Sequence, residues 1–174
     1  MALQIAQFNI GFMPVKTLLI TILALVFSQF SLSDEERSTS HLETIVLGAG
    51  CFWGAEKEYA AITGVVDAVS GYADGRGVSP TYREITQYRN RFNPNNHAEV
   101  VQVTFNNNIL SSKELLRHYF EGHDPTQVNQ QGNDVGTQYR SIILTTTSGQ
   151  LESANQTLSS YQELLNDAGY GKIA

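Results

Sequence analysis

Two strand-like stretches follow one another along the chain with no helix between them: VVDAVS at residues 65–70 and AEVVQVTF at residues 98–105. Both are rich in β-branched and apolar residues, which is typical of strands, and Gly71 and the asparagines at 106–108 end them. Two consecutive strands with a strand–helix unit before them and a helix–strand unit after them predict a split β-α-β arrangement.

The rest of the chain supplies those flanking units. Two further strands are predicted over residues 43–49 and 139–146, and helical patterns begin near residues 55, 111 and 147. Ser111 and Glu114 have the spacing of a capping box, and Thr147 or Ser148 is the expected cap of the last helix. The order β-α-β-β-α-β-α predicts an α+β fold. We expect a two-layer sandwich with a ferredoxin-like β-α-β-β-α-β core, helices on one face, and long loops around the active site.

Composition narrows the class of protein. A chain of 174 residues, 41% of them hydrophobic, is expected to form one domain with a real core. Its formal net charge of −6 argues against a nucleic-acid partner, because binding along phosphates needs a basic face. The single cysteine, Cys51, excludes an intramolecular disulfide and a cysteine-rich zinc site. Histidine and carboxylate ligands could still build a metal site, but we predict none.

The first 33 residues differ from the remainder and predict a targeting segment. Lys16 is their only charged residue, and residues 18–27 form an apolar run of about ten residues, whereas a membrane span needs about 20. This pattern is typical of a secretory signal peptide with cleavage before Asp34, so we expect the secretory pathway or secretion. The alternative is an uncleaved signal anchor, which would hold the protein at a membrane. Residues 34–42 are interpreted as a linker and residues 43–174 as the folded domain.

The only cysteine lies in GCFWG at residues 50–54, where the first strand meets the first helix. A thiol at a helix N-terminus faces unpaired backbone N–H groups and the positive end of the helix dipole, and both stabilise the thiolate. Cys51 is therefore a candidate nucleophile, and the alternative is a buried inert cysteine. Phe52 and Trp53 could form an apolar clamp for a small uncharged group, or could belong to the core.

Glu99 is a candidate general acid. It shares the period-two face of the strand with Val101 and Val103, so its carboxyl should be partly removed from water. Burial raises the pKa of a carboxyl, which lets it keep and donate a proton near neutral pH. The alternative is a glutamate at a strand end that lies in solvent.

Several motifs resemble those of the peptide-methionine (S)-S-oxide reductases, the methionine sulfoxide reductase A family. They cover residue 44 to the end of the chain, in order: GCFWG (50–54), GYA (71–73), PTY (80–82), HAEVV (97–101), HDPTQ (123–127) and GNDVGTQYRS (132–141). The resemblance implies that Cys51 is the nucleophile and Glu99 the acid. It also implies that Phe52 and Trp53 hold the methyl group of the sulfoxide. The resemblance further implies that Tyr82 and Tyr139 hydrogen-bond the sulfoxide oxygen. It implies that Asp134, also in the substrate-binding site, orients its neighbours through water.

The resemblance implies thiol-dependent reduction of methionine S-sulfoxide, free or in proteins, through a sulfenic acid on Cys51. Such a reaction repairs proteins under oxidative stress. No bound cofactor is expected. The expected partners are oxidised proteins and an external thiol reductant, either a thioredoxin-like protein or a small dithiol, and a monomer is expected.

The chain departs from the family pattern at four places. Residues 83–96 are longer than the usual loop, residues 129–132 read NQQG instead of NRQG, and no second cysteine is present to resolve an oxidised Cys51. The chain also stops at Ala174, where members usually continue. We therefore expect either a piece of a longer sequence or a domain without that element.

Two other functions stay open from the sequence. A cysteine hydrolase would use Cys51 with His97 or His123 and with Asp124 or Asp134, and it needs an imidazole within hydrogen-bond reach of the thiol. An inactive module that binds oxidised methionine is the other alternative.

Overall fold

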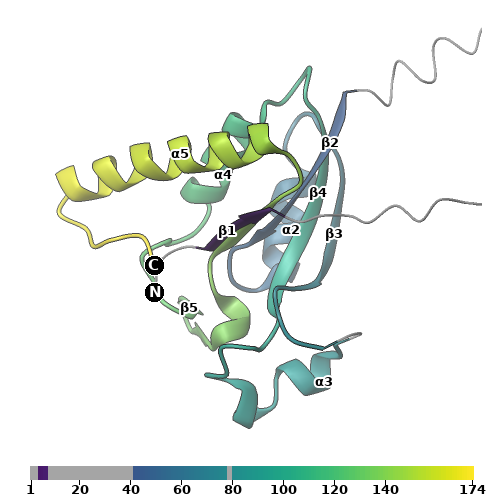
Figure 1. Ribbon diagram of the computed structural model, residues 1–174, viewed down its shortest axis with the longest axis vertical. Coiled ribbons are helices and arrows are strands. Elements are labelled where there is room, and N and C mark those ends of the chain that lie inside the picture. The colour runs from purple at the N-terminus through teal and green to yellow at the C-terminus, as the bar shows by residue number, and fades with distance from the viewer. Residues whose placement is uncertain (1–3, 8–40, 78–79) are drawn as a thin grey trace, which may run out of the picture.

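The sheet has the predicted ferredoxin-like topology. The computed structural model describes residues 4–7, 41–77 and 80–174 (Figure 1). Its main strands are β2 (Leu42–Gly48), β3 (Val65–Ala73), β4 (Ala98–Asn106) and β7 (Ile142–Thr145). They lie in the order β7-β2-β4-β3, and each neighbouring pair is antiparallel. The prediction of an α+β fold with a split β-α-β core is confirmed.

A fifth strand extends this sheet. β1 (Gln4–Gln7) pairs in parallel with β7 at the edge of the sheet. It falls inside the segment predicted to be a signal peptide, where no strand was predicted. The rest of that segment, residues 1–3 and 8–33, lies outside the described residues, as do residues 34–40 of the expected linker. Leu42, the last residue of that linker, belongs to β2 instead.

Three helices form the second layer: α2 (Phe52–Ala60), α4 (Ser112–Glu121) and α5 (Ser148–Asp167). They cover one face of the sheet, because alternate residues of the strands and inward residues of the helices belong to one buried cluster. Its members include Leu47, Val103 and Phe105 from strands and Leu115, Tyr119 and Ala154 from helices. None of the helices among the described residues has the length and apolarity needed to cross a membrane.

The helix caps agree with the sequence. Ser111 and Glu114 form the predicted capping box, and Thr147 caps α5 by accepting a hydrogen bond from the Gln150 N–H. The last strand begins later than predicted, at Ile142 instead of residue 139, because residues 137–139 form the 3-10 helix η2 (Thr137–Tyr139). Two short strands, β5 (Gln130–Gln131) and β6 (Asp134–Val135), pair with each other just before it.

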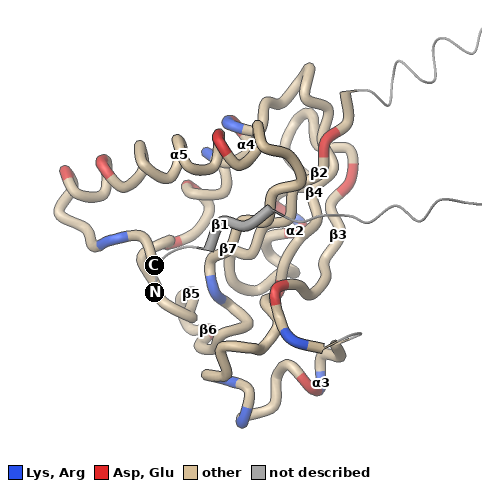
Figure 2. The backbone as a smooth tube through the Cα atoms, viewed as in Figure 1, with Lys and Arg blue, Asp and Glu red and all other residues tan. Residues whose placement is uncertain are grey.

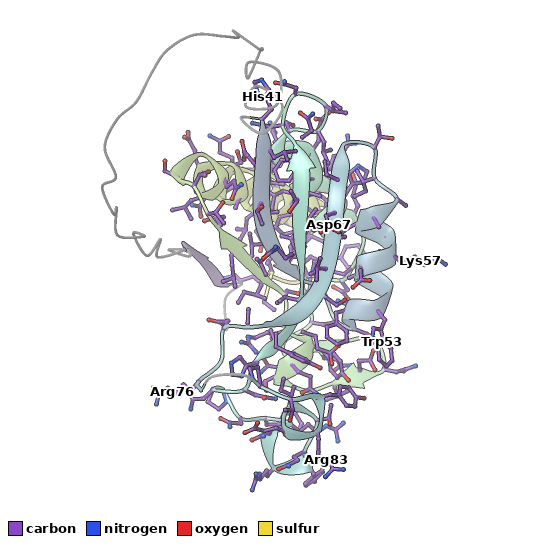
Figure 3. The ribbon with its side chains drawn as sticks, turned by 90° about the vertical axis from the view of Figure 1, so that its right-hand side faces the viewer. His41, Trp53, Lys57, Asp67, Arg76 and Arg83 are labelled. Atoms are coloured by element: carbon purple, nitrogen blue, oxygen red, sulfur yellow. The ribbon has the colours of Figure 1, made fainter. Side chains whose placement is uncertain are left out.

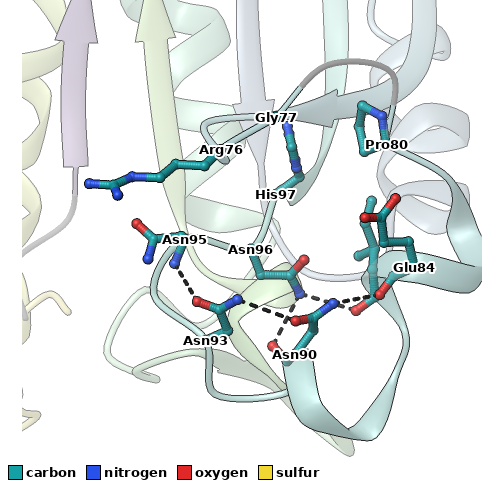
Figure 4. A pocket seen from close by; sticks show the side chains of 10 residues that line it. Arg76, Gly77, Pro80, Glu84, Asn90, Asn93, Asn95, Asn96 and His97 are labelled. Atoms are coloured by element: carbon teal, nitrogen blue, oxygen red, sulfur yellow. Dashed lines mark hydrogen bonds between the residues drawn. The ribbon is translucent and has the colours of Figure 1, made fainter.

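The long segment before β4 is ordered by side-chain amides. It contains α3 (Tyr82–Ile85) and the 3-10 helix η1 (Tyr88–Asn90). The buried Asn96 amide donates to the carbonyls of Ile85 and Asn90, and the Asn90 amide donates to the carbonyl of Glu84 at 2.7 Å. These bonds surround a small cavity of about 130 Å³ (Figure 4). These bonds hold the segment in one conformation, and they thereby fix the position of Tyr82, which the sequence predicts to bind substrate.

Arg140 joins three loops beside the site. Its side chain, 7% exposed, donates to the carbonyls of Asn96 and Thr137 and to both the carbonyl and the carboxylate of Asp74. The ion pair with the Asp74 carboxylate measures 2.9 Å. Arg140 thus connects Asp74, which follows β3, with Asn96 in the loop before β4 and with η2.

Candidate active site

Cys51 lies at the N-terminus of α2, as predicted. It is the residue before the first turn of the helix, and the turn from β2 into it passes through Gly50 with a φ of +96°. A Cβ at Gly50 would lie 2.7 Å from the side chain of Gln131, so both the conformation and the space require glycine there. The partly exposed Cys51 lines a cavity of about 200 Å³ together with Ala55, Gln131 and Asp134.

Glu99 is buried beside the start of the same helix. Only 2% of its surface is exposed, and its Oε2 accepts a hydrogen bond of 3.2 Å from the N–H of Phe52, the residue after Cys51. Burial raises the pKa of Glu99. The hydrogen bond from Phe52 opposes that effect, and the nearby charge of Asp134 adds to it. The predicted position on the buried face is confirmed, and the alternative of a solvent-exposed strand-end glutamate is wrong.

Aromatic rings surround this position. The ring of the buried Phe52 lies 6.0 Å from that of Trp53 and 5.3 Å from that of Tyr72, measured between centroids. Trp53 is 70% exposed, so it stands at the rim of the site and not in the core (Figure 3). Tyr72 pairs with Glu99 across β3 and β4, and burial followed by the Glu99 charge raises its pKa. Together the three rings provide an apolar wall beside Glu99.

The remaining predicted residues meet on the other side. Tyr82, Tyr139 and Asp134 line one cleft of about 380 Å³, and Asp134 also lines the cavity of Cys51. The pKa of Tyr139 is raised by burial first and by the charge of Glu99 second. The structure therefore brings together all seven predicted site residues: Cys51, Phe52, Trp53, Tyr82, Glu99, Asp134 and Tyr139. The site therefore combines a thiol, a buried acid, apolar rings and phenol hydroxyls. Such a site suits attack by the thiol on a small molecule that has one polar and one apolar part.

Comparison with known proteins shows the family to which the chain belongs. The family model described as peptide methionine sulfoxide reductase matches residues 43–170. The chain belongs to the peptide methionine sulfoxide reductase family. The MsrA of Corynebacterium kroppenstedtii is 46% identical over 130 residues, and that of Xylella fastidiosa is 46% identical over 132 residues. These matches cover 75% and 76% of this chain but only 57% and 59% of the relatives, so the chain spans less than two thirds of their length.

Several solved structures have the same fold, among them a methionine sulfoxide reductase A. The enzyme of Corynebacterium diphtheriae superposes with a TM-score of 0.70 at 41% identity, covering 77% of this chain and 62% of that one. Reduced Mxr1 from Saccharomyces cerevisiae has a TM-score of 0.66 at 31% identity, covering 78% and 74%. Mxr1 in complex with Trx2 has a TM-score of 0.54 at 25% identity, covering 78% and 73%.

A cysteine hydrolase needs an imidazole hydrogen-bonded to its thiol, and His118, which lines the cavity of Cys51, makes no such bond in the described part of the chain. All four lie in the described residues, and no hydrogen bond there joins Cys51 to an imidazole. Both ring nitrogens of His123 are occupied, Nδ1 by the carbonyl of Tyr119 at 2.6 Å and Nε2 by the hydroxyl of Ser141 at 2.9 Å. Burial lowers the pKa of His123, and the Asp124 carboxylate accepts hydrogen bonds within its own loop. The side chains of His123 and Asp124 are therefore engaged in structural hydrogen bonds.

Three residues that border the site were not predicted from the sequence. Tyr72 appeared only as part of a turn motif, although its register opposite Glu99 follows once β3 and β4 are paired. Tyr88 and Arg91 line the cleft of Tyr82 and Tyr139, but they belong to the segment that departs from the family pattern. No motif could have assigned them, because their position depends on how that segment folds back.

Proposed function

We propose that this chain reduces methionine S-sulfoxide, free or in proteins, to methionine, with Cys51 as the nucleophile and Glu99 as the proton donor. The observation that carries the proposal is the buried Glu99 carboxyl, hydrogen-bonded to the backbone of the residue that follows Cys51. A sulfoxide is a poor electrophile until its oxygen is protonated, since negative charge builds on that oxygen during attack. An acid with a raised pKa beside a helix-terminal thiol answers that requirement.

The first chemical step transfers one oxygen atom. The Cys51 thiolate attacks the sulfoxide sulfur while Glu99 protonates the oxygen, and the oxygen then leaves that sulfur for Cys51. The methionine sulfur is reduced by two electrons, and Cys51 is oxidised by two electrons to the sulfenic acid. The products are methionine and a Cys51 sulfenic acid.

The walls of the site suit the two halves of the substrate. Phe52 and Trp53 offer an apolar surface to the methyl group, as the family resemblance implies, and Tyr72 extends that surface. Tyr82 and Tyr139 offer hydroxyl donors to the oxygen, and the raised pKa of Tyr139 keeps its hydroxyl protonated. Asp134, between the two cavities, is placed to orient these groups through water.

We propose that an external thiol recycles Cys51, because the 174 residues given contain no second cysteine. In this proposal the external thiol attacks the Cys51 sulfenic acid, releasing water and forming a mixed disulfide. A second thiol then releases reduced Cys51. We propose a thioredoxin-like protein or a small dithiol as this reductant, and the complex of the related Mxr1 with Trx2 supports the former.

The decisive experiment measures N-acetylmethionine formed from N-acetylmethionine S-sulfoxide with a small dithiol. Cys51→Ser should abolish turnover, because a serine hydroxyl is a poor nucleophile at its ordinary pKa. With one equivalent of this sulfoxide and no reductant, mass spectrometry should show one added oxygen on Cys51 and one N-acetylmethionine released per chain. Turnover near wild type in Cys51→Ser would refute the assignment, and equal rates on both sulfoxide epimers would refute the selectivity.

Two other outcomes identify the alternatives. Binding of the sulfoxide without release of methionine, under excess dithiol, would make the chain an inactive module that recognises oxidised methionine. A Cys51–Cys51 disulfide between two chains, forming as fast as methionine is released, would make a dimer the recycling unit in place of an external thiol.

We also propose that the protein enters the secretory pathway through the apolar segment at residues 18–27. Cleavage before Asp34 would remove β1 and leave β7 as the edge of the sheet. N-terminal sequencing of the protein recovered from its compartment should begin at Asp34. Recovery of a chain that still begins at Met1 in a membrane fraction would favour the signal anchor, and recovery only from the cytosol would contradict export.

A further inference from the structure

The cleft of Tyr82 and Tyr139 extends beyond the atoms that the reaction needs. Its outer wall is formed by Tyr88 and Arg91, which come from the segment between α3 and β4. Asp134 borders both this cleft and the cavity of Cys51, so the two spaces adjoin. A peptide that places its sulfoxide at Cys51 therefore has room in this cleft for a neighbouring residue.

The side chain of Arg91 is held in place by part of its guanidinium, and its remaining N–H donors are free to bind a ligand. Its Nε donates to the carbonyl of Val135 at 3.0 Å, its backbone carbonyl accepts from Thr137, and its guanidinium lies 5.5 Å from the ring centroid of Phe92. Its two Nη groups make no hydrogen bond or ion pair with any residue that the structure describes. A fixed guanidinium with two free nitrogens matches the geometry of a carboxylate.

The charge of this end of the molecule differs from that of the rest. The chain carries 17 carboxylates against 11 basic residues, but residues 76–97 contain four arginines and one carboxylate, Glu84. Figure 2 shows blue segments gathered around α3, and Figure 3 shows Arg76 and Arg83 at that end of the molecule. No ion pair among the described residues involves any of the four arginines, which are Arg76, Arg83, Arg89 and Arg91. The basic end thus borders the candidate active site of an acidic protein.

The cleft has the other features of a peptide-binding surface. Tyr88 is 86% exposed and Phe92 is also largely exposed, and tyrosine and arginine are enriched where proteins bind one another tightly. The asparagine hydrogen bonds of Figure 4 fix the segment between α3 and β4 before any ligand arrives. A preformed surface loses less conformational freedom on binding.

We propose that this cleft binds the residue next to the methionine sulfoxide in a protein substrate, and that it prefers an acidic side chain, which pairs with Arg91. The inference rests on the proposed function and specifies its substrate class: oxidised methionines within acidic segments. Arg83 and Arg89 attract such segments over a longer range, and Arg91 contacts them.

The test compares two peptides that are identical except for aspartate or asparagine on both sides of one methionine S-sulfoxide. The measured quantity is the ratio of kcat/KM for the aspartate peptide to that for the asparagine peptide. We expect a ratio of about 3–10 in the wild type, as for one partly screened charge-assisted pair. The ratio should approach 1 in Arg91→Gln, and also in the wild type near 1 M salt, where the screening length is about 3 Å. Arg91→Lys should retain part of the preference, since it keeps the charge and loses the planar fork.

Arg117→Gln is the matched control. Arg117 is an exposed arginine of α4 outside the cleft, so its removal changes the net charge equally and should leave the ratio at the wild-type value. A ratio of 1 in the wild type, with good activity on N-acetylmethionine S-sulfoxide, would overturn this inference and leave the proposed function intact. No activity on that small substrate would overturn the proposed function instead. If Arg91→Gln raised only the KM for a protein reductant, the cleft would be a docking site for the reductant and the inference would be wrong.

Discussion

Replacing Arg140 tests how the loops of the site are held together. Its buried guanidinium makes four hydrogen bonds to three separate loops, and Asp74 is its ion-pair partner at 2.9 Å. Arg140→Met keeps a similar apolar volume but leaves the Asp74 carboxylate and three carbonyls without these donors. Removing one partner of a buried pair costs about 3–5 kcal/mol, so we expect the free energy of unfolding to fall by that amount.

Two further variants separate charge from geometry. Arg140→Lys keeps the cation, but one ammonium group cannot reach all four acceptors, so we expect it to lose roughly half as much stability as Arg140→Met. Asp74→Asn removes only the charge of the partner and keeps its backbone carbonyl as an acceptor, for an expected loss of about 1–3 kcal/mol.

Urea unfolding followed by circular dichroism measures these differences, with the slope m showing whether the transition stays two-state. Tyr139, a candidate substrate-binding residue, is the last residue of η2 and directly precedes Arg140. Loss of the Arg140 bonds should therefore displace Tyr139 and raise the KM for the sulfoxide in Arg140→Met. Stability of Arg140→Met within about 1 kcal/mol of wild type would refute the reasoning, since the four bonds would then contribute almost nothing.

Three further predictions follow from the same structure. Glu99→Gln should slow the chemical step by about 10²–10⁴-fold and remove the fall of kcat/KM at high pH that loss of the Glu99 proton causes; a pH profile equal to wild type would exclude Glu99 as the acid. The pKa of His123 is lowered in the folded state, so its contribution to stability is present above its ordinary value of 6.5 and is lost as the pH falls through the lowered value. The melting temperature should therefore drop less between about pH 7 and pH 5 in His123→Gln than in wild type; an equal drop would contradict this. Gly64→Ala should lower the free energy of unfolding in urea by about 2–4 kcal/mol, because φ is +99° and the new Cβ would lie 2.6 Å from the side chain of Leu110. Gly169→Ala, where φ is +77° and the space is open, should lower it by only about 1 kcal/mol. Equal losses in the two variants would refute the steric contribution at Gly64.

Local signals in the sequence were enough for the secondary structure and its order. The alternation of Glu99, Val101 and Val103 showed which residues of β4 share one buried face, and the capping box of Ser111 and Glu114 located the start of α4. These features depend on neighbours within a few residues, so they can be read without knowing the fold. The position of Cys51 at the start of a helix was predictable for the same reason.

Tertiary structure alone decided which distant groups meet. β1 lies against β7 across more than a hundred residues, and no local pattern in Gln4–Gln7 shows that pairing. Residues 139–141 were expected to be strand, but residue 139 ends η2 and residues 140–141 are in neither helix nor strand, and the buried side chain of Arg140 bonds to carbonyls up to 66 residues away. Tyr72 and Arg91 reach the site only through strand register and the fold of the segment before β4. A buried polar group must find its partners wherever the chain brings them, and that choice is made by packing over long sequence distances and not by local preference.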